Sequence, residues 1–311
     1  MLEAGVLVTG AGGFIGAALA EHLIAQGEPV VVMLRDHSRK AFPAHVPVIR
    51  GDVTDAALCR RALADYQVKT VYHLAANSIV SSCAEDPVGA MYTNVMGTTH
   101  LLQAVRDAGR PIRVVVMTSD KVYGKAQAPY TEDTPFEAEH AYEVSKACQD
   151  LAVRMYRQNY GLDATVVRAV NVYGPGDPNE TRLIPRAVKR CLAGQAPVVH
   201  AGAAEISRQY LYVDDMVAAL QIIARMGTRG AYCVGAPGAP LTVLEVIRAI
   251  TAECGVEFVH ELAARDVRFK EISFQSVDDT RLRGLGWTPR ITFDVGIRQV
   301  VEHMRGQYEV R

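Results

Sequence analysis

Two kinds of apolar pattern alternate along the first half of the chain. Short runs of consecutive apolar residues predict buried strands, and apolar residues that recur every three or four positions predict helices. The predicted strands are Val6–Val8, Val30–Leu34, Val46–Arg50, Thr70–Ala75, Ile112–Met117 and Ala164–Val167. The predicted helices begin at Ala17, Asp55, Pro87 and Tyr142 and end near Ile24, Tyr66, Ala108 and Tyr160. This alternation predicts an α/β fold with a parallel, doubly wound sheet.

The pattern becomes shorter and more mixed after Arg168. Residues 171–179 are rich in Asn, Gly and Pro and predict a loop. Residues 209–213 predict a strand that returns to the main sheet, followed by a helix from Asp214 to about Met226. We therefore expect a larger domain over residues 1–170, to which residues 206–235 return. A smaller, interleaved region is expected over residues 171–205 and 236–311.

Composition and charge exclude several classes of protein. The 311 residues carry a net charge of −1 with a pI near 6.8, so no basic surface indicates a nucleic-acid partner. No run of about 18 apolar residues predicts a membrane span. The chain enters its first strand within a few residues, which leaves no room for a signal peptide and predicts a cytoplasmic protein. The scattered cysteines and histidines show no metal-ligand spacing, so we predict no metal.

A glycine-rich turn separates the first predicted strand from the first helix. Gly10, Gly13 and Gly16 would allow a tight turn, a close approach of the backbone to a pyrophosphate and tight packing of helix on strand. The helix N-terminus offers free N–H groups to phosphates, so we predict that Phe14 and Ile15 also contact a dinucleotide. An ordinary strand–helix turn is the alternative. With this turn, the fold class is a Rossmann-type sheet and residues 1–170 become a dinucleotide-binding domain.

The ends of the following strands supply the other predicted contacts to the cofactor. Arg35 and Asp36 follow the second strand: a carboxylate favours NAD, whereas an arginine favours the 2′-phosphate of NADP. The sequence favours NAD and leaves NADP open. The remaining predicted contacts are Asp52 and Val53 after the third strand, and Leu74, Ala75 and Ala76 after the fourth.

A serine, a tyrosine and a lysine form the predicted catalytic group. Ser119 stands at a strand end, and Tyr142 and Lys146 lie one turn apart on a predicted helix. An ammonium beside a phenol would lower the phenol pKa from about 10 and make Tyr142 a usable base. Such a pair also occurs as solvated surface residues, but its order after the glycine turn and Ser119 favours catalysis.

These segments resemble the extended short-chain dehydrogenase/reductase family that acts on nucleotide-sugars. The resemblance covers nearly the whole chain and rests on TGAGGFIG, GDVTD, HLAA, YTNVMGT, TSDKVYG, YEVSK, RAVNVYGPG, RQYLYVDD and LGWTP. Asp120 and Lys121, with PYTEDTPF, HAYEVSKA and EISFQSVDDTRLRGLGW, look most like CDP-glucose 4,6-dehydratases. Gln209 departs from the aspartate that is common after the phosphate-binding arginine.

The resemblance implies an internal redox cycle on a nucleotide-diphosphate sugar. Tyr142 would take the proton of the 4-hydroxyl as hydride passes to NAD⁺, Asp120 would protonate the departing 6-hydroxyl, and Lys121 would assist removal of H5. The alternative for Asp120 and Lys121 is a structural ion pair. The other implied contacts are Asn94 to the cofactor, and Asn171, Arg208 and Arg265 to the substrate, with Ser119 beside the sugar.

Two alternative functions and an oligomeric state complete the expectations. An epimerase or reductase on the same scaffold is the nearer alternative, and a non-catalytic NAD(P)-binding sensor is the remote one. The resemblance also implies a homodimer in which the helices around 87–108 and 142–160 form a four-helix bundle with their mates.

Overall fold

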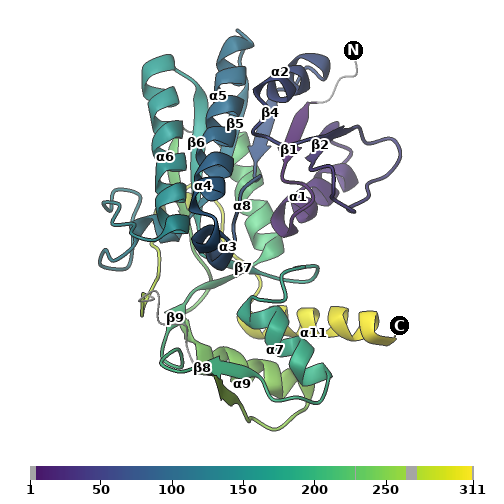
Figure 1. The fold of residues 1–311 in the computed structure, drawn as a ribbon, viewed down its shortest axis with the longest axis vertical. Helices are drawn as coiled ribbons and strands as arrows, with labels where there is room; N and C mark the ends of the chain where they lie inside the picture. Colours follow the sequence, from purple (N-terminus) through teal and green to yellow (C-terminus); the bar gives the residue numbers. More distant parts are fainter. Residues whose placement is uncertain (1–4, 228, 264–271, 310–311) are drawn as a thin grey trace.

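A seven-stranded parallel sheet with helices on both faces forms the larger part of the protein (Figure 1). The computed structural model describes residues 5–227, 229–263 and 272–309. The strand order is β11-β6-β5-β4-β1-β2-β3, with parallel pairing throughout. The strands are β1 (Val6–Thr9), β2 (Val30–Leu34), β3 (Val48–Arg50), β4 (Thr70–His73), β5 (Arg113–Ser119), β6 (Asp163–Ala169) and β11 (Gly230–Val234). The predicted Rossmann-type fold class is confirmed.

Alternate residues of the central strands pack into two separate apolar cores. In β1, Val6 and Val8 join the core that also contains Leu19 of α1, whereas Leu7 joins the core that contains Leu101 of α5. This follows from the two-residue period of a strand. The helices are α1 (Phe14–Ala25) and α8 (Val213–Met226) on the first side, and α2 (Ala56–Asp65), α5 (Gly97–Asp107) and α6 (Ala141–Tyr160) on the second.

The predicted helix over Pro87–Ala108 contains one turn of a different kind. It is formed by α4 (Pro87–Met91), the π-helical turn η1 (Tyr92–Met96) and α5. Asp86 caps its start, because its Oδ1 accepts a hydrogen bond from Gly89 N at 2.8 Å. The short helix α3 (Val80–Glu85) precedes it, and the 3-10 turn η2 (Asp120–Tyr123) follows β5.

A smaller region follows the sheet (Figure 1). Its helix α11 packs against both α7 and α9. Its elements are β7 (Asn171–Tyr173), α7 (Leu183–Leu192), β8 (Val198–His200), β9 (Ser207–Arg208), β10 (Tyr210–Tyr212), β12 (Leu241–Thr242), α9 (Val243–Cys254), β13 (Glu261–Ala263), α10 (Thr280–Arg283) and α11 (Phe293–Glu309).

Two predictions about this region are wrong. The predicted loop over residues 171–179 begins with a strand, β7, and the segment 209–213 does not return to the main sheet. Instead, Tyr210–Tyr212 pairs in parallel with Asn171–Tyr173. The main sheet has no place for β10 beside β6, because β11 pairs with β6 along that edge. The domain boundaries given above stay a prediction. Among the helices of the described residues, none has both the length and the apolar character that a membrane crossing needs.

Candidate active site

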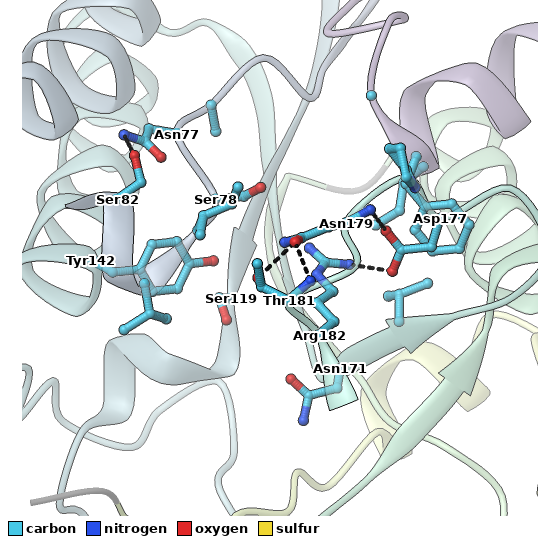
Figure 2. Close-up of a pocket in the computed structure, with 18 of the residues that line it drawn as sticks. Asn77, Ser78, Ser82, Ser119, Tyr142, Asn171, Asp177, Asn179, Thr181 and Arg182 are labelled. Atoms are coloured by element: carbon cyan, nitrogen blue, oxygen red, sulfur yellow. Dashed lines mark hydrogen bonds and ion pairs between the residues drawn. The ribbon is translucent and has the colours of Figure 1, made fainter. Parts of the chain in front are cut away.

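A cavity of about 1110 Å³ lies at the carboxyl ends of the sheet strands, where such sheets bind ligands. Its lining comes from the glycine turn, the ends of β2, β3, β4 and β5, the start of α6, and the smaller region through β7, α7, β8 and β9. Figure 2 shows Tyr142 and Ser119 on one side of it and Asn171, Arg182 and Asp177 on the other. The cavity therefore connects the predicted cofactor site with the predicted catalytic residues.

The glycine turn packs so tightly that two of its glycines have no room for a side chain. Gly10 has φ +73°, and a Cβ there would lie 2.6 Å from the backbone N of Ala75. A Cβ on Gly16 would lie 2.2 Å from the carbonyl oxygen of Gly10. Gly13 differs, because its nearest neighbour would be 3.4 Å away. Gly13 therefore presents open backbone to the cavity beside the N-terminus of α1, and this cradle fits a dinucleotide pyrophosphate.

The strand ends place nearly all of the other predicted cofactor contacts around the same cavity. Arg35 lines the cavity, whereas its neighbour Asp36 does not. The turn after β2 is held by Arg50, whose Nη1 donates to the carbonyl oxygens of Arg35 (3.3 Å) and Ser38 (2.9 Å). The further lining residues predicted from sequence are Phe14, Ile15, Asp52, Val53, Leu74, Ala75 and Ala76.

Tyr142 and Ser119 meet at the cavity wall. Figure 2 shows the Tyr142 ring projecting from the start of α6 with its hydroxyl toward Ser119 at the end of β5. Burial raises the pKa of Tyr142 to about 12, although a hydrogen bond with Ser119 opposes the rise. The expected lowering of this pKa is therefore wrong for the ligand-free protein, because desolvation of the phenolate outweighs the attractive interactions around it.

Lys146 is buried and bound to neutral groups. Its Nζ donates to the carbonyl oxygen of Met117 (3.2 Å) and to Oε1 of Gln149 (2.9 Å). Burial lowers the pKa of Lys146 to about 8, because its ammonium loses its hydration shell and no carboxylate of the described residues pairs with it. Lys146 lines the cavity beside Tyr142, as the helical spacing predicted.

A chain of buried polar side chains connects Lys146 to the glycine turn. Gln149 Nε2 donates to Thr98 Oγ1 (2.9 Å), Thr98 Oγ1 contacts His73 Nε2 (2.9 Å), and His73 Nδ1 contacts Thr9 Oγ1 (2.8 Å). Burial lowers the pKa of His73 to about 3, so the imidazole stays neutral. Sequence reasoning missed this chain, because its members lie on four different elements.

Asn94 was predicted to contact the cofactor, but it does not line the cavity. It is fully buried in η1, where its Oδ1 accepts from Asn77 N at 2.7 Å and its Nδ2 donates to Ser145 Oγ at 2.9 Å. Its observed contacts therefore tie the loop after β4 to α6. A π-helical turn often marks a functional site, but no pattern in the sequence indicates one here.

Asp120 and Lys121 occupy different environments. Asp120 is 4% exposed and lies outside the cavity lining, and its Oδ1 accepts a hydrogen bond from Ser119 Oγ at 3.1 Å. Burial raises the pKa of Asp120, although Lys121 and Arg208 both oppose the rise. Lys121 lines the cavity, and its Nζ donates to Gln275 Oε1 at 3.0 Å.

The comparisons with known proteins agree with this arrangement. Residues 7–300 match the family model described as GDP-mannose 4,6 dehydratase. The chain belongs to this family. It is 31% identical to the dTDP-glucose 4,6-dehydratase of Mycolicibacterium smegmatis, over 96% of this chain and 93% of the relative. It is 32% identical to the UDP-glucose 4-epimerase of the same organism, over 97% of this chain and 98% of the relative.

A solved structure extends the likeness to the fold. The crystal structure of the dTDP-glucose 4,6-dehydratase DesIV from Streptomyces venezuelae, with NAD bound, matches with a TM-score of 0.87 and 28% identity. The match covers 98% of each chain. Family members thus include dehydratases and epimerases of nucleotide-sugars, and this chain is similar to both.

The smaller region supplies predicted and unpredicted residues to the cavity. Asn171 and Arg208 line the cavity as predicted, whereas Arg265 lies outside the described residues. Sequence reasoning missed Arg182, whose Nη1 pairs with Asp177 Oδ2 at 3.2 Å. The other missed lining residues include Asn77, Ser78, Ser82, Asn179, Thr181, Arg186 and His200. The predicted loop over residues 171–179 marked part of this wall, but nothing in its composition indicated that α7 would supply an arginine.

Proposed function

We propose that the protein is a nucleotide-hexose 4,6-dehydratase, which converts its substrate to a 4-keto-6-deoxy sugar without net use of cofactor. The observation that carries this proposal is the placement of Asp120 and Lys121 directly after Ser119 and beside Tyr142. An epimerase needs a base at C4 only. A dehydratase also needs an acid for the 6-hydroxyl and a base for H5.

The cofactor proposed for this site is NAD, held by the glycine turn at its pyrophosphate and by residues 74–76 near the nicotinamide. When bound, NAD supplies a hydride acceptor and a positive charge. That charge matters for Tyr142, because in the ligand-free protein the phenol pKa of about 12 keeps the hydroxyl protonated at neutral pH. Tyr142 then takes the proton of the 4-hydroxyl, and Ser119 holds the same hydroxyl in place.

The elimination step uses the two residues after Ser119. The raised pKa of Asp120 favours a protonated carboxyl group, which is the form that an acid must have before it protonates a leaving hydroxyl. Lys121 Nζ, at the cavity wall, accepts the proton from C5. Water leaves across C5 and C6, and the 4-keto group makes H5 acidic enough for an amine base.

The proposed nucleotide-diphosphate site lies between Asn171 and Arg208. Both line the cavity on the side of the smaller region, and so does the unpredicted Arg182, which Figure 2 shows on the same side as Asn171. Guanidinium groups suit diphosphate oxygens. CDP-glucose is the substrate proposed from the sequence resemblance, whereas the relatives described above are named for dTDP-glucose and UDP-glucose.

A second candidate is a nucleotide-sugar 4-epimerase. The observation in its favour is that Asp120 lies outside the cavity lining, as a structural carboxyl group would. In that case Ser119 and Tyr142 alone carry out the chemistry at C4. The two reactions differ in the composition of the product, because only dehydration loses water.

Mass spectrometry of a substrate panel tests the proposal. The purified protein is incubated with CDP-glucose, dTDP-glucose, UDP-glucose and GDP-mannose, with Tyr142→Phe as the matched inactive control. We expect one hexose to lose one water. A product of unchanged mass with inverted configuration at C4 would favour the epimerase, and no product from any hexose would contradict both candidates.

We also propose a homodimer built on α4, η1, α5 and α6. Exposed apolar side chains lie on α4, η1 and α6, and Val88 of α4 is 77% exposed. The others are Met91, Tyr92, Met96, Leu151 and Met155. Such a patch on packed helices is typical of a protein–protein interface. Light scattering after gel filtration should give a dimer for the wild type and a monomer for Val88→Glu/Leu151→Glu; a monomeric wild type would contradict the proposal.

We place the enzyme in the cytoplasm. All six cysteines are free thiols, which favours a reducing compartment. Detection of the native protein only outside the cytoplasm after cell fractionation would contradict this assignment.

A further inference from the structure

An extended segment, residues 272–278, connects the catalytic side of the cavity to the proposed phosphate side. We call it the strap. On one side, Tyr130 N donates to Ser276 O at 2.8 Å, and Asp278 N donates to Tyr130 O at 2.7 Å. On the other side, Ser207 N donates to Ser273 O at 2.8 Å. The strap is therefore fixed by its backbone between the loop after η2 and strand β9.

Gln275, in the middle of the strap, holds the amine of Lys121. Its side chain is 1% exposed, and its Oε1 accepts the hydrogen bond from Lys121 Nζ at 3.0 Å. Its Nε2 is buried and makes no hydrogen bond of standard geometry within the described parts of the chain, although the Gln275 side chain interacts with the hydroxyl of Tyr130. The reverse orientation of the amide would place Nε2 against Nζ, donor against donor, so Lys121 fixes which way the amide points.

The same strap holds the arginine of the proposed phosphate site. Arg208 Nη2 donates to the carbonyl oxygen of Ile272 at 2.6 Å. The next residue, Gln209, accepts a hydrogen bond from Val277 N on its Oε1 at 2.9 Å. The departure from the common aspartate at this position thus has a structural role, because the Gln209 side chain holds the strap. One backbone segment therefore sets the positions of both Arg208 and Lys121.

We propose that Gln275 is a positioning residue for the reaction, which holds Lys121 Nζ at the cavity wall with a neutral acceptor. The inference rests on the proposed function, in which Lys121 takes the proton from C5. A base must be able to lose its own proton before it acts. A carboxylate at position 275 would add an ion pair to the amine and so favour its ammonium form, whereas the amide oxygen of Gln275 orients the amine without adding that charge.

Several titratable groups share this corner of the site with Lys121. Asp120 comes from the same turn as Lys121. Three further groups interact electrostatically with Asp120: Arg208 of β9, Tyr142 of α6 and Tyr130 of the loop after η2. None of these groups belongs to the strap. Gln275 is the strap residue whose side chain bonds Lys121, so a charge placed at position 275 acts on Lys121 directly.

Competitive labelling of the ligand-free protein tests the contact without any substrate. Wild type, Gln275→Glu and the control Gln127→Glu, which adds the same charge at an exposed position near η2, are treated with acetic anhydride over a range of pH. Peptide mass spectrometry then gives the titration of Lys121. We expect Gln275→Glu to raise the Lys121 pKa by about 1 unit or more, and Gln127→Glu to leave it unchanged. Equal titrations in all three proteins would overturn the inference.

Steady-state kinetics then tests the role in catalysis, with the hexose of the four-member panel that the wild type consumes fastest. Gln275→Met keeps the length of the side chain and removes both polar groups of the amide. We expect kcat to fall about tenfold with KM within threefold of the wild type, and we expect Gln275→Glu to move the acidic limb of the kcat profile to higher pH. A loss of kcat with an unmoved pH profile would show a merely structural role. If no hexose reacts, the proposed function fails, whereas the labelling result still decides whether Gln275 controls Lys121.

Discussion

The two ends of the cavity are built in different ways. At the glycine turn, six of the seven consecutive residues from 10 to 16 line the cavity and form a cradle. At the other end, side chains from β5, η2, α6 and β9 converge, and Lys121 bonds a residue 154 positions away. The first end depends on local geometry, whereas the second depends on tertiary packing. A local site can be predicted from sequence, and a site assembled by packing can be predicted only where a family resemblance names its residues.

The two ends also differ in electrostatics. The glycine turn presents uncharged N–H groups. The chemical end buries Asp120, Tyr142 and Lys146, and burial moves each pKa toward the neutral form of the group: up for Asp120 and Tyr142, and down for Lys146. The proposed chemistry therefore depends on what binding would add, because a cationic nicotinamide ring and a diphosphate would bring further charges next to these three groups.

The largest expected effect belongs to the phenol. Tyr142→Phe removes the base and should lower kcat by about 10³-fold. NAD binding should stay within a few-fold of the wild type, because the glycine end is untouched. Turnover and calorimetry measure the two effects. Tyr160→Phe, at the exposed end of the same helix, is the control. A Tyr142→Phe enzyme within tenfold of the wild type would remove the assignment.

The next effect concerns the buried amine. Between its folded pKa of about 8 and the ordinary value of 10.5, the unfolded chain binds more protons at Lys146, so the free energy of unfolding rises with pH. Lys146→Met removes this contribution. We expect the stability of the variant relative to the wild type to fall by about 2.5 kcal/mol from pH 7 to pH 10.

Urea unfolding of the ligand-free proteins measures this difference. Tyr142 acts in the opposite direction only at higher pH, because its raised pKa of about 12 makes stability fall above pH 10. A difference that stays constant from pH 7 to pH 10 would show that Lys146 is charged in the folded protein.

A smaller effect tests whether Asp120 acts as an acid in the reaction or is a structural carboxyl group. Asp120→Asn cannot transfer a proton, so loss of the 6-hydroxyl should slow by about 30-fold while the first oxidation continues. Reduced-nicotinamide absorbance should then accumulate in single turnovers. Asp133→Asn, on an exposed neighbour, should show no accumulation. Full activity without accumulation in Asp120→Asn would return Asp120 to a structural role.

The smallest effect separates two glycines of the same turn. A methyl group on Gly13 would lie 3.4 Å from its nearest protein neighbour, the Gly10 carbonyl oxygen, which is an ordinary van der Waals contact. Gly13→Ala should therefore leave the thermal midpoint of unfolding unchanged and weaken NAD binding about tenfold. Gly16→Ala should instead lower the midpoint, because its methyl group would meet the Gly10 carbonyl oxygen at 2.2 Å. Calorimetry and thermal unfolding record both. Equal effects of the two substitutions would contradict the assignment of Gly13 to cofactor binding and of Gly16 to packing within the turn.

Much of the fold could be predicted because the first half repeats one local pattern. The ends of β2 were predicted to the residue, and Asp55 caps α2 through bonds from Ala57 N and Leu58 N. The pairing of β10 with β7 could not be predicted, because strand partners are chosen by tertiary packing. The sequence spacing correctly predicted that Ser119, Tyr142 and Lys146 lie together at the cavity. The role of Gln275 could not be predicted, because the segment that contains it indicated only a resemblance to a family.

The pKa of Tyr142 shows a second limit of prediction from sequence. Sequence spacing correctly placed Lys146 one turn from the phenol, but it carried no information on burial. Burial decides the sign of the shift, and it raises the pKa instead of lowering it. The position of Asn94 outside the cavity lining could not be predicted for the same reason. A polar residue on a helix can face a ligand or a buried protein partner, and only packing decides between them.

The most direct test of the account follows one hydrogen atom. A nucleotide-hexose labelled with deuterium at C4 is given to the enzyme, and the product is examined by NMR and mass spectrometry. The account predicts loss of one water and deuterium at C6, because the hydride taken beside Ser119 and Tyr142 returns to the carbon that lost its hydroxyl. Deuterium that stays at C4, in a product of unchanged mass, would contradict it.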